Sequence, residues 1–207
     1  MQYPVNLVLD GRHCLVVGGG KVALRKVEGL LACGARVRVV APRITADLAA
    51  LAPAVTLDHR PWRPEDMSGA WLVIAATDDP AVNRAVFETG ERAGIWVNGA
   101  DDPANCAFTL PSVVHRGDLQ LTVSTGGRSP AMATWLRRRL EDEIGPEYAV
   151  LLDLLADERD VLKAAGRSTE GLDWNSALDS DMLGLIRTGD LAHARERLQT
   201  CLSSSSD

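Results

Sequence analysis

The chain has 207 residues, 46% of them hydrophobic, which is enough for one doubly wound α/β domain and a smaller module. A net charge of −6 disfavours nucleic acid as a partner, and the apolar runs are far shorter than the roughly 20 residues of a membrane-spanning helix. The four cysteines lack C-x-x-C pairing, which argues against a zinc cage or a disulfide framework, and no basic-then-apolar leader opens the chain, so we expect a cytoplasmic protein.

The stretch CLVVGGGKVALRK, residues 14–26, predicts a strand, a glycine turn and a helix. Within it Gly18, Gly20 and Ala23 fit the pattern G-x-G-x-x-[GA]. The first glycine of that pattern allows a tight turn, the second lets the backbone approach a pyrophosphate, and the third small residue lets the helix pack on the strand. A tight glycine turn without a ligand is the alternative interpretation.

A second strand, ARVRVV at 35–40, would run parallel to the first, because crossover connections of this kind are right-handed. Dinucleotide sites usually carry Asp or Glu at the end of this strand to hold the adenosine ribose. Here the strand ends in Ala41-Pro42-Arg43, and Arg43 could favour a 2′-phosphate. The choice between NAD and NADP is therefore open on these residues alone.

The pattern continues as alternating strands and helices up to about residue 107. We expect a helix at 46–51 after Thr45, a strand at 55–60, a helical turn at 64–66, a central strand at 71–76, a helix at 81–93 and a strand at 95–98. Because ligands of such sheets sit at the carboxyl ends of the strands, Thr77-Asp78 and the loop with Asp101 should share one edge with the glycine turn. Asp101 is a candidate acid or base, although Asp78 and Asp79 are also ordinary helix caps and Asp101-Asp102-Pro103 an ordinary turn.

The next segment predicts a hairpin, 108–114 with 119–124, and a helix at 131–143 that begins with Ser129 as cap and Pro130 in the first position. Residues 112–140 hold five arginines and one acid, a local charge of +4 that would attract an anion. The turn Thr125-Gly126-Gly127-Arg128 before the helix is either a second anion site or only part of a well-capped helix. Arg137–Arg139 form either a solvated helix face or a contact for a polyanion.

Helical spacing returns at 148–165, 174–186 and 191–202. We therefore predict an α/β fold with three parts: a Rossmann-like parallel-sheet domain at 1–107, a hairpin-and-helix segment at 108–145, and a small all-helical module at 146–207.

Taken in order, these motifs resemble the precorrin-2 dehydrogenase family, the Rossmann-domain enzymes of sirohaem synthesis. The resemblance covers about Tyr3 to Leu140. It rests on VVGGGKVALRK, GARVRVVAP, LVIAATDDPAVN, V-N-x-x-D-D-P at 97–103, F-x-x-P-S at 108–112 and STGGRSPA at 124–131.

The resemblance implies NAD-dependent oxidation of precorrin-2 to sirohydrochlorin, with Asp101 as the acid–base residue and no resident metal. It also implies a homodimer formed through the middle segment. The cofactor contacts are then expected at Gly18, Gly20, Lys21, Val22, Pro42, Arg43, Thr77 and Asp78. The contacts to the polycarboxylate substrate are expected at Arg116, Thr125, Gly126 and Arg128.

Three departures from the family pattern and two alternative functions remain. Some members have Asn where this chain has Ala41. Thr125 stands where some members have a phosphorylatable serine, and Gly99-Ala100 where two β-branched residues are common. Some members are also ferrochelatases, for which Asp101 or His115 could be the base. A non-catalytic NAD-sensing module would need the glycine turn but neither the Asp101 loop nor the arginine-rich segment.

Overall fold

The computed structural model describes residues 2–100 and 102–203, and the chain divides into two compact units, Met1–Leu110 and Pro111–Asp207. Each unit is described by itself. The division lies close to the predicted end of the sheet domain at residue 107. The further separation of the second part into a hairpin segment and a helical module stays a prediction.

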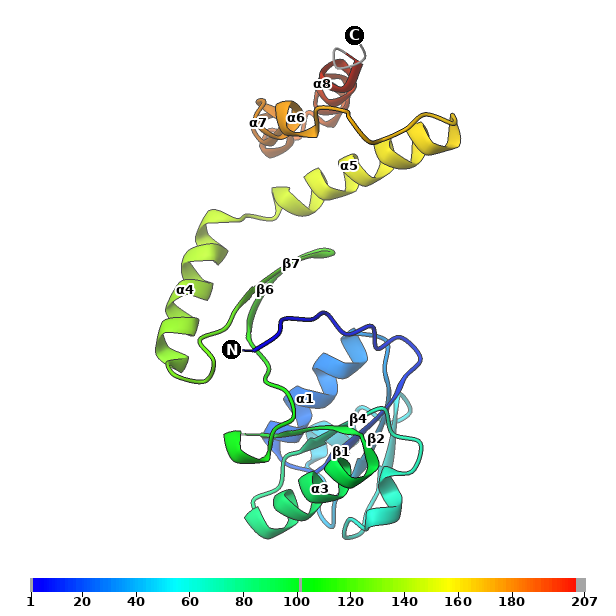
Figure 1. The fold of residues 1–207 in the computed structure, drawn as a ribbon, viewed down its shortest axis with the longest axis vertical. Helices are drawn as coiled ribbons and strands as arrows, with labels where there is room; N and C mark the ends of the chain where they lie inside the picture. Colours follow the sequence, from blue (N-terminus) through cyan, green and yellow to red (C-terminus); the bar gives the residue numbers. More distant parts are fainter. Residues whose placement is uncertain (1, 101, 204–207) are drawn as a thin grey trace. The chain divides into compact units, whose positions relative to one another are not determined.

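The first unit contains a five-stranded parallel sheet in the order β3-β2-β1-β4-β5. The predicted Rossmann-like α/β fold is confirmed, and the helices α1 and α3 flank the sheet (Figure 1). Its elements are β1 (His13–Val17), α1 (Lys21–Ala32), β2 (Arg36–Val40), α2 (Ala46–Ala49), β3 (Val55–Asp58), η1 (Pro64–Met67), β4 (Leu72–Ala75), α3 (Pro80–Ala93), β5 (Trp96–Gly99) and η2 (Pro103–Asn105).

Helices cover both faces of the sheet. The central strands are therefore apolar on both faces. In β1, Val16 belongs to a buried cluster with Val27 of α1, whereas Val17 belongs to another buried cluster with Val86 of α3. The alternation follows from the two-residue period of a strand. The long apolar runs in the sequence therefore mark strands buried between two layers of helices.

The register aligns the carboxyl ends of four strands in one row. Val17 lies opposite Val40 on one side and Ala75 on the other, and Ala75 lies opposite Gly99. The loops that follow β1, β2, β4 and β5 therefore leave the sheet at the same edge, as predicted. The chain reverses its order of strands between β1 and β4, which is the place where open α/β sheets bind ligands.

The second unit joins a hairpin to a set of helices (Figure 1). Its elements are β6 (Ser112–Arg116), β7 (Leu119–Val123), α4 (Pro130–Glu143), α5 (Glu147–Ala164), α6 (Trp174–Leu178), α7 (Met182–Arg187) and α8 (Leu191–Ser203). One buried cluster, which includes Leu154, Met182 and Leu198, holds α5, α7 and α8 together. Among the described residues, no helix is both long and apolar enough to cross a bilayer.

The single helix expected at 174–186 is wrong, because α6 and α7 are separate helices. At the break, the Ser180 hydroxyl donates to the carbonyl oxygen of Ala177 at 2.6 Å, and Asp181 is the N-cap of α7. Side chains of Ser and Asp compete for backbone hydrogen bonds and so favour helix ends over helix interiors. The apolar spacing runs through this break because both helices contribute to the same cluster.

Candidate functional site

The glycine turn after β1 is closely packed at its start. Gly18 has φ +132°, and a Cβ added there would lie 2.2 Å from the carbonyl oxygen of Ala76. A Cβ on Gly19 would lie 2.1 Å from the carbonyl oxygen of Arg43. The turn therefore wedges between the loops that follow β4 and β2, and only glycine fits at these two positions.

Gly20 is different, because an added Cβ would meet no atom within 4 Å. This residue is the N-cap of α1 in an extended conformation, with φ −92° and ψ −170°, and it supplies no side-chain cap. The first turn of α1 contains no acidic residue either. Since first-turn N–H groups have no partners within their helix, the helix start presents its amides and its positive dipole end to the open space above Gly20.

Ala23 completes the pattern, because it is fully buried in the cluster between α1 and the sheet. The three small residues thus do three different things: Gly18 permits close packing, Gly20 leaves open space, and Ala23 lets the helix approach the strand. A cradle of this kind suits the pyrophosphate of a dinucleotide.

The corner after β2 lies beside the glycine turn. The amide of Thr45 donates to the carbonyl oxygen of Gly19 at 2.9 Å, while Pro42 and Arg43 are exposed. The carboxylate of Asp58 on the neighbouring strand is engaged by Arg38, whose Nη2 lies 2.5 Å from it. The end of β2 itself carries no carboxylate, because the strand continues into Ala41-Pro42-Arg43.

The loop after β4 is held by Asn83. Its Oδ1 accepts hydrogen bonds from the amide of Thr77 at 3.2 Å and from the Thr77 hydroxyl at 2.8 Å, and its Nδ2 donates to the Thr77 carbonyl at 2.9 Å. The cap of α3 falls on Asp79, whose carboxylate accepts from two first-turn amides, and Asp78 is exposed beside it. Asn83 lies near the start of α3 and is buried. Its bonds to Thr77 show that it fixes the shape of this loop.

The loop after β5 carries Asp101, which lies outside the described residues. The amide of Ala100 donates to the Ala75 carbonyl at 2.8 Å. The carboxylate of Asp102 accepts a hydrogen bond from Asn105 Nδ2 at 2.6 Å. Burial raises the pKa of the Cys106 thiol, so this group is protonated at neutral pH.

The arginines of the second unit differ in what they contact. Arg116 donates to the carbonyl oxygens of Ile144 at 2.7 Å and Glu141 at 2.9 Å, which are at the C-terminal end of α4. It thus supplies the positive charge that a helix C-terminus favours. Arg137 pairs with Glu141, so at least one of the three consecutive arginines belongs to an intrahelical ion pair.

The turn before α4 is well ordered by its own hydroxyls. The Thr125 hydroxyl accepts from the amide of Ser129 and donates to its carbonyl, both at 3.2 Å, and the Ser129 hydroxyl caps α4 by accepting from Met132. Gly126 and Arg128 are exposed within this turn. The predicted helix cap is confirmed, and anion binding by the turn stays a prediction.

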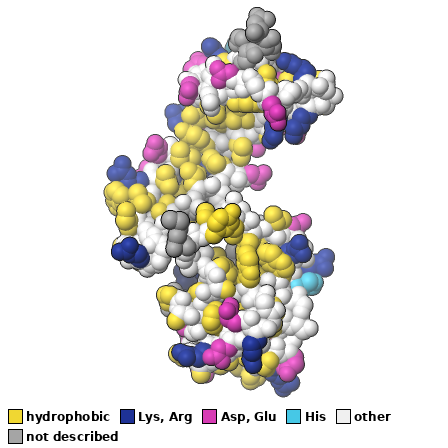
Figure 2. Space-filling view, viewed as in Figure 1, with side chains coloured by type: hydrophobic (Ala, Val, Ile, Leu, Met, Phe, Trp, Pro, Cys, Tyr) yellow, Lys and Arg dark blue, Asp and Glu magenta, His cyan; other side chains and the backbone are white. Residues whose placement is uncertain are grey.

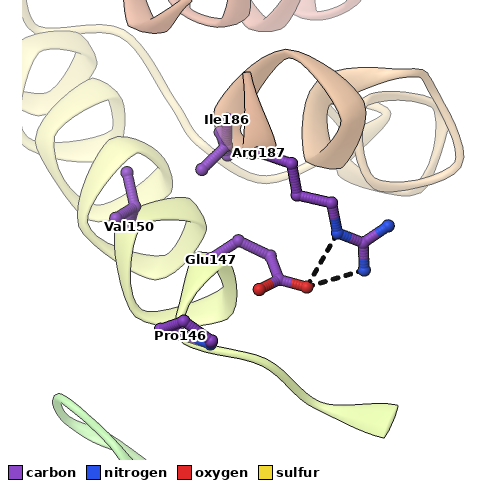
Figure 3. A pocket seen from close by; sticks show the side chains of 5 residues that line it. All are labelled: Pro146, Glu147, Val150, Ile186 and Arg187. Atoms are coloured by element: carbon purple, nitrogen blue, oxygen red, sulfur yellow. Dashed lines mark hydrogen bonds and ion pairs between the residues drawn. The ribbon is translucent and has the colours of Figure 1, made fainter. Parts of the chain in front are cut away.

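A hollow of about 310 Å³ lies in the second unit where α5 begins (Figure 3). At its edge both Nε and Nη2 of Arg187 donate to one oxygen of Glu147, at 2.9 and 2.6 Å. A backbone hydrogen bond at the start of α5 and the one from Arg187 lower the pKa of Glu147. The ion pair links α5 to α7.

Among the described residues, no group of three or more His, Cys, Asp or Glu side chains could hold a metal ion.

Comparison with known proteins agrees with this geometry. Residues 5–112 match the family model described as "Putative NAD(P)-binding", and residues 116–143 match the one described as "Sirohaem biosynthesis protein central". The chain belongs to the N-terminal Rossmann family of the sirohaem synthases and precorrin-2 dehydrogenases.

Members of this family align with nearly the whole chain. The siroheme synthase of Thioalkalivibrio sulfidiphilus is 41% identical over 99% of this chain, and that of Chromobacterium violaceum is 38% identical over 95%. The chain spans only 43% of the length of each. The solved structure of SirC, a precorrin-2 dehydrogenase, superimposes with a TM-score of 0.74 at 27% identity and covers 97% of this chain and 98% of SirC.

Proposed function

We propose that this chain is a nicotinamide-dependent dehydrogenase that oxidises precorrin-2 to sirohydrochlorin, a step in sirohaem biosynthesis in the cytoplasm. The observation that carries the proposal is the open, uncapped start of α1 above Gly20, at the edge where the ends of four parallel strands are aligned. The family of the chain, and the likeness to SirC along nearly its entire length, support the substrate.

The residues at this edge fit a dinucleotide. Gly18, Gly20, Lys21 and Val22 would hold the pyrophosphate, Pro42 and Arg43 would border the adenosine ribose, and Thr77 and Asp78 would border the nicotinamide side. When bound, the cofactor would accept a hydride from the substrate. We propose NAD in preference to NADP, in line with the resemblance to the precorrin-2 dehydrogenases, and the test is a titration with both.

Removal of a hydride from precorrin-2 leaves a proton to be removed as well. We propose that the Asp101 carboxylate accepts that proton, so that the macrocycle loses two electrons and two protons, one as hydride to NAD⁺ and one to the protein. Both neighbours of Asp101 are held by backbone hydrogen bonds, Ala100 to β4 and Asp102 to Gly99. The two residues that flank the proposed acid–base group therefore lie at the same edge of the sheet as the glycine turn.

The polycarboxylate substrate would be attracted by the positive segment of the second unit. Arg128 and Gly126 are exposed at the turn before α4, and Thr125 shapes that turn. Arg116 has N–H groups left after capping α4, so it could contact a carboxylate as well. We propose these four residues as substrate contacts.

We also propose a homodimer formed through the hairpin and α4. Met132 and Trp135 on α4 are 53% and 55% exposed, and apolar side chains lie at the surface of this part of the chain (Figure 2). Large exposed apolar groups on one helix are typical of an interaction surface.

The test is anaerobic incubation of the protein with precorrin-2 and NAD⁺, with absorbance followed for both NADH and the oxidised macrocycle. Equal amounts of the two products are expected, and NAD binding without reduction would favour a sensor over an enzyme.

The variant Asp101→Asn should bind NAD but no longer oxidise precorrin-2, whereas the exposed control Asp179→Asn should still oxidise it. Incubation of sirohydrochlorin with Fe²⁺ or Co²⁺ in the absence of NAD⁺ tests the ferrochelatase alternative.

A further inference from the structure

The loop between β5 and η2 is closed at its neck. Asn98 and Cys106 form an antiparallel bridge, and the amide of Ala107 donates to the carbonyl of Val97 at 2.8 Å. The buried side chain of Asn98 donates to the carbonyl of Phe108 at 2.8 Å. The chain therefore returns to β5 directly after the loop, so the loop begins and ends at one place.

The thiol of Cys106 points into this closed loop. Its Sγ lies 3.2 Å from the carbonyl oxygen of Gly99 and 3.2 Å from that of Asp102, and Asn98 Nδ2 lies 3.5 Å from it. A thiol is a weak donor with one proton, and both carbonyls lie within its reach. The raised pKa keeps that proton in place at neutral pH. The two carbonyls lie on either side of residue 101 in the sequence.

Asn105 secures the same loop from the other end. Its amide donates to the carbonyl of Asp102 at 3.1 Å, and its side chain donates to the Asp102 carboxylate at 2.6 Å. A Cβ on Gly99 would lie 2.8 Å from the carbonyl oxygen of Asn105, so the loop closes too tightly for a side chain there. This close approach gives the departure from β-branched residues at this position a local reason.

We infer that Cys106 is a positioning residue for the reaction: its thiol holds the carbonyls of Gly99 and Asp102, and so fixes the backbone on either side of the proposed acid–base residue. The inference rests on the proposed function. It gives the thiol a role as a hydrogen-bond donor, with no covalent or redox step. Loss of this hydrogen bond should lower turnover strongly, because misplacement of a catalytic group by about 1 Å can cost two orders of magnitude in rate.

Two variants of Cys106 separate the hydrogen bond from the volume of the side chain. Ala and Ser are both smaller than Cys, so they leave similar space, but only Ser keeps a donor. Cys33→Ala is the matched control, since Cys33 is exposed and distant in sequence from the loop. For each variant, kcat with precorrin-2, the Kd for NAD⁺, and amide hydrogen exchange at Ala100 and Asp102 are measured.

We expect Cys106→Ala to lower kcat by at least about tenfold while the Kd for NAD⁺ stays within about twofold of wild type, because the cofactor cradle lies on other loops. Exchange at Asp102 should accelerate in the same variant. Cys106→Ser should return kcat to within about threefold of wild type, because a hydroxyl also donates. Cys33→Ala should resemble wild type in all three measurements.

Three results would overturn the inference: equal kcat values for Cys106→Ala and wild type, equal losses in the Ala and Ser variants, or a loss of NAD⁺ affinity that matches the loss of kcat. An unchanged rate of amide exchange at Asp102 in Cys106→Ala would show that the thiol does not hold the backbone of this loop. Failure of the proposed function looks different, because wild-type protein would then show no turnover, whatever residue 106 is.

Discussion

Replacement of Gly20 by alanine separates the cofactor site from the fold. The new Cβ would meet no protein atom within 4 Å, and φ −92° with ψ −170° is allowed for alanine. Alanine is a slightly poorer N-cap than glycine but lowers the entropy of the unfolded chain, so the free energy of unfolding should change by less than about 1 kcal/mol. The methyl group would nevertheless extend about 1.5 Å into the space that a pyrophosphate would use.

We therefore expect Gly20→Ala to weaken NAD⁺ binding by roughly 10- to 100-fold, about 1.4–2.8 kcal/mol, with little change in melting temperature. Calorimetric titration with NAD⁺ and a thermal unfolding curve measure the two quantities on one preparation. Wild-type affinity in a folded Gly20→Ala protein would refute the proposed cradle, because it would mean that the cofactor does not lie against the backbone of residue 20.

Gly18→Ala is the contrasting variant. Its φ of +132° and the 2.2 Å approach of an added Cβ to Ala76 both oppose a side chain. We expect a loss of roughly 2–4 kcal/mol in the free energy of unfolding. At about 2–4 °C per kcal/mol, the melting temperature should fall by roughly 5–15 °C. A melting temperature equal to wild type would show that the turn relaxes more readily than the structure indicates.

Three further changes test other contacts. A hydrogen bond from Arg60, followed by smaller contributions from a backbone amide and Arg38, lowers the pKa of Asp66. The ionised carboxylate therefore adds to the free energy of unfolding near neutral pH, and this contribution is lost as pH falls below about 4. In Asp66→Asn, the free energy of unfolding measured in urea should fall less steeply with acidification. Asn83→Ala leaves the Thr77 amide and carbonyl without their partner and should cost about 1–3 kcal/mol and weaken NAD⁺ binding. Arg116→Ala should destabilise the second unit by about 1–3 kcal/mol in the same unfolding assay, because two carbonyls at the end of α4 lose their donor.

Exposed residues of the same type serve as controls: Asp47→Asn, Asn175→Ala and Arg138→Ala. An acid limb unchanged in Asp66→Asn would remove that carboxylate from the acid sensitivity. Full NAD⁺ affinity in Asn83→Ala would show that the loop after β4 does not contribute to binding. If Arg116→Ala keeps wild-type stability but loses turnover, the guanidinium acts on the substrate and not on α4.

Patterns local in sequence were enough for the architecture. The apolar runs at β1 and β4 and the glycine turn before α1 predicted a parallel sheet and its ligand edge, because a buried strand and a helix each need a periodicity that is visible within a few residues. The same reasoning placed Ser129 as the cap of α4 correctly. The prediction of one helix over α6 and α7 was wrong. Both helices contribute apolar residues to one cluster, so the helical spacing of apolar residues continues across the break between them.

Only the tertiary structure decided which backbone groups these residues meet. That Gly18 is required depends on Ala76, which is brought to it by the pairing of β4 with β1, and the roles of Asn83, Cys106 and Arg116 depend on carbonyls reached only after the loops have closed. The physical reason is the range of the interactions: propensity and periodicity act between neighbours along the chain, whereas hydrogen bonds and steric exclusion act over about 3 Å in space. A sequence therefore predicts the element that carries a functional residue more readily than the contacts that hold it in place.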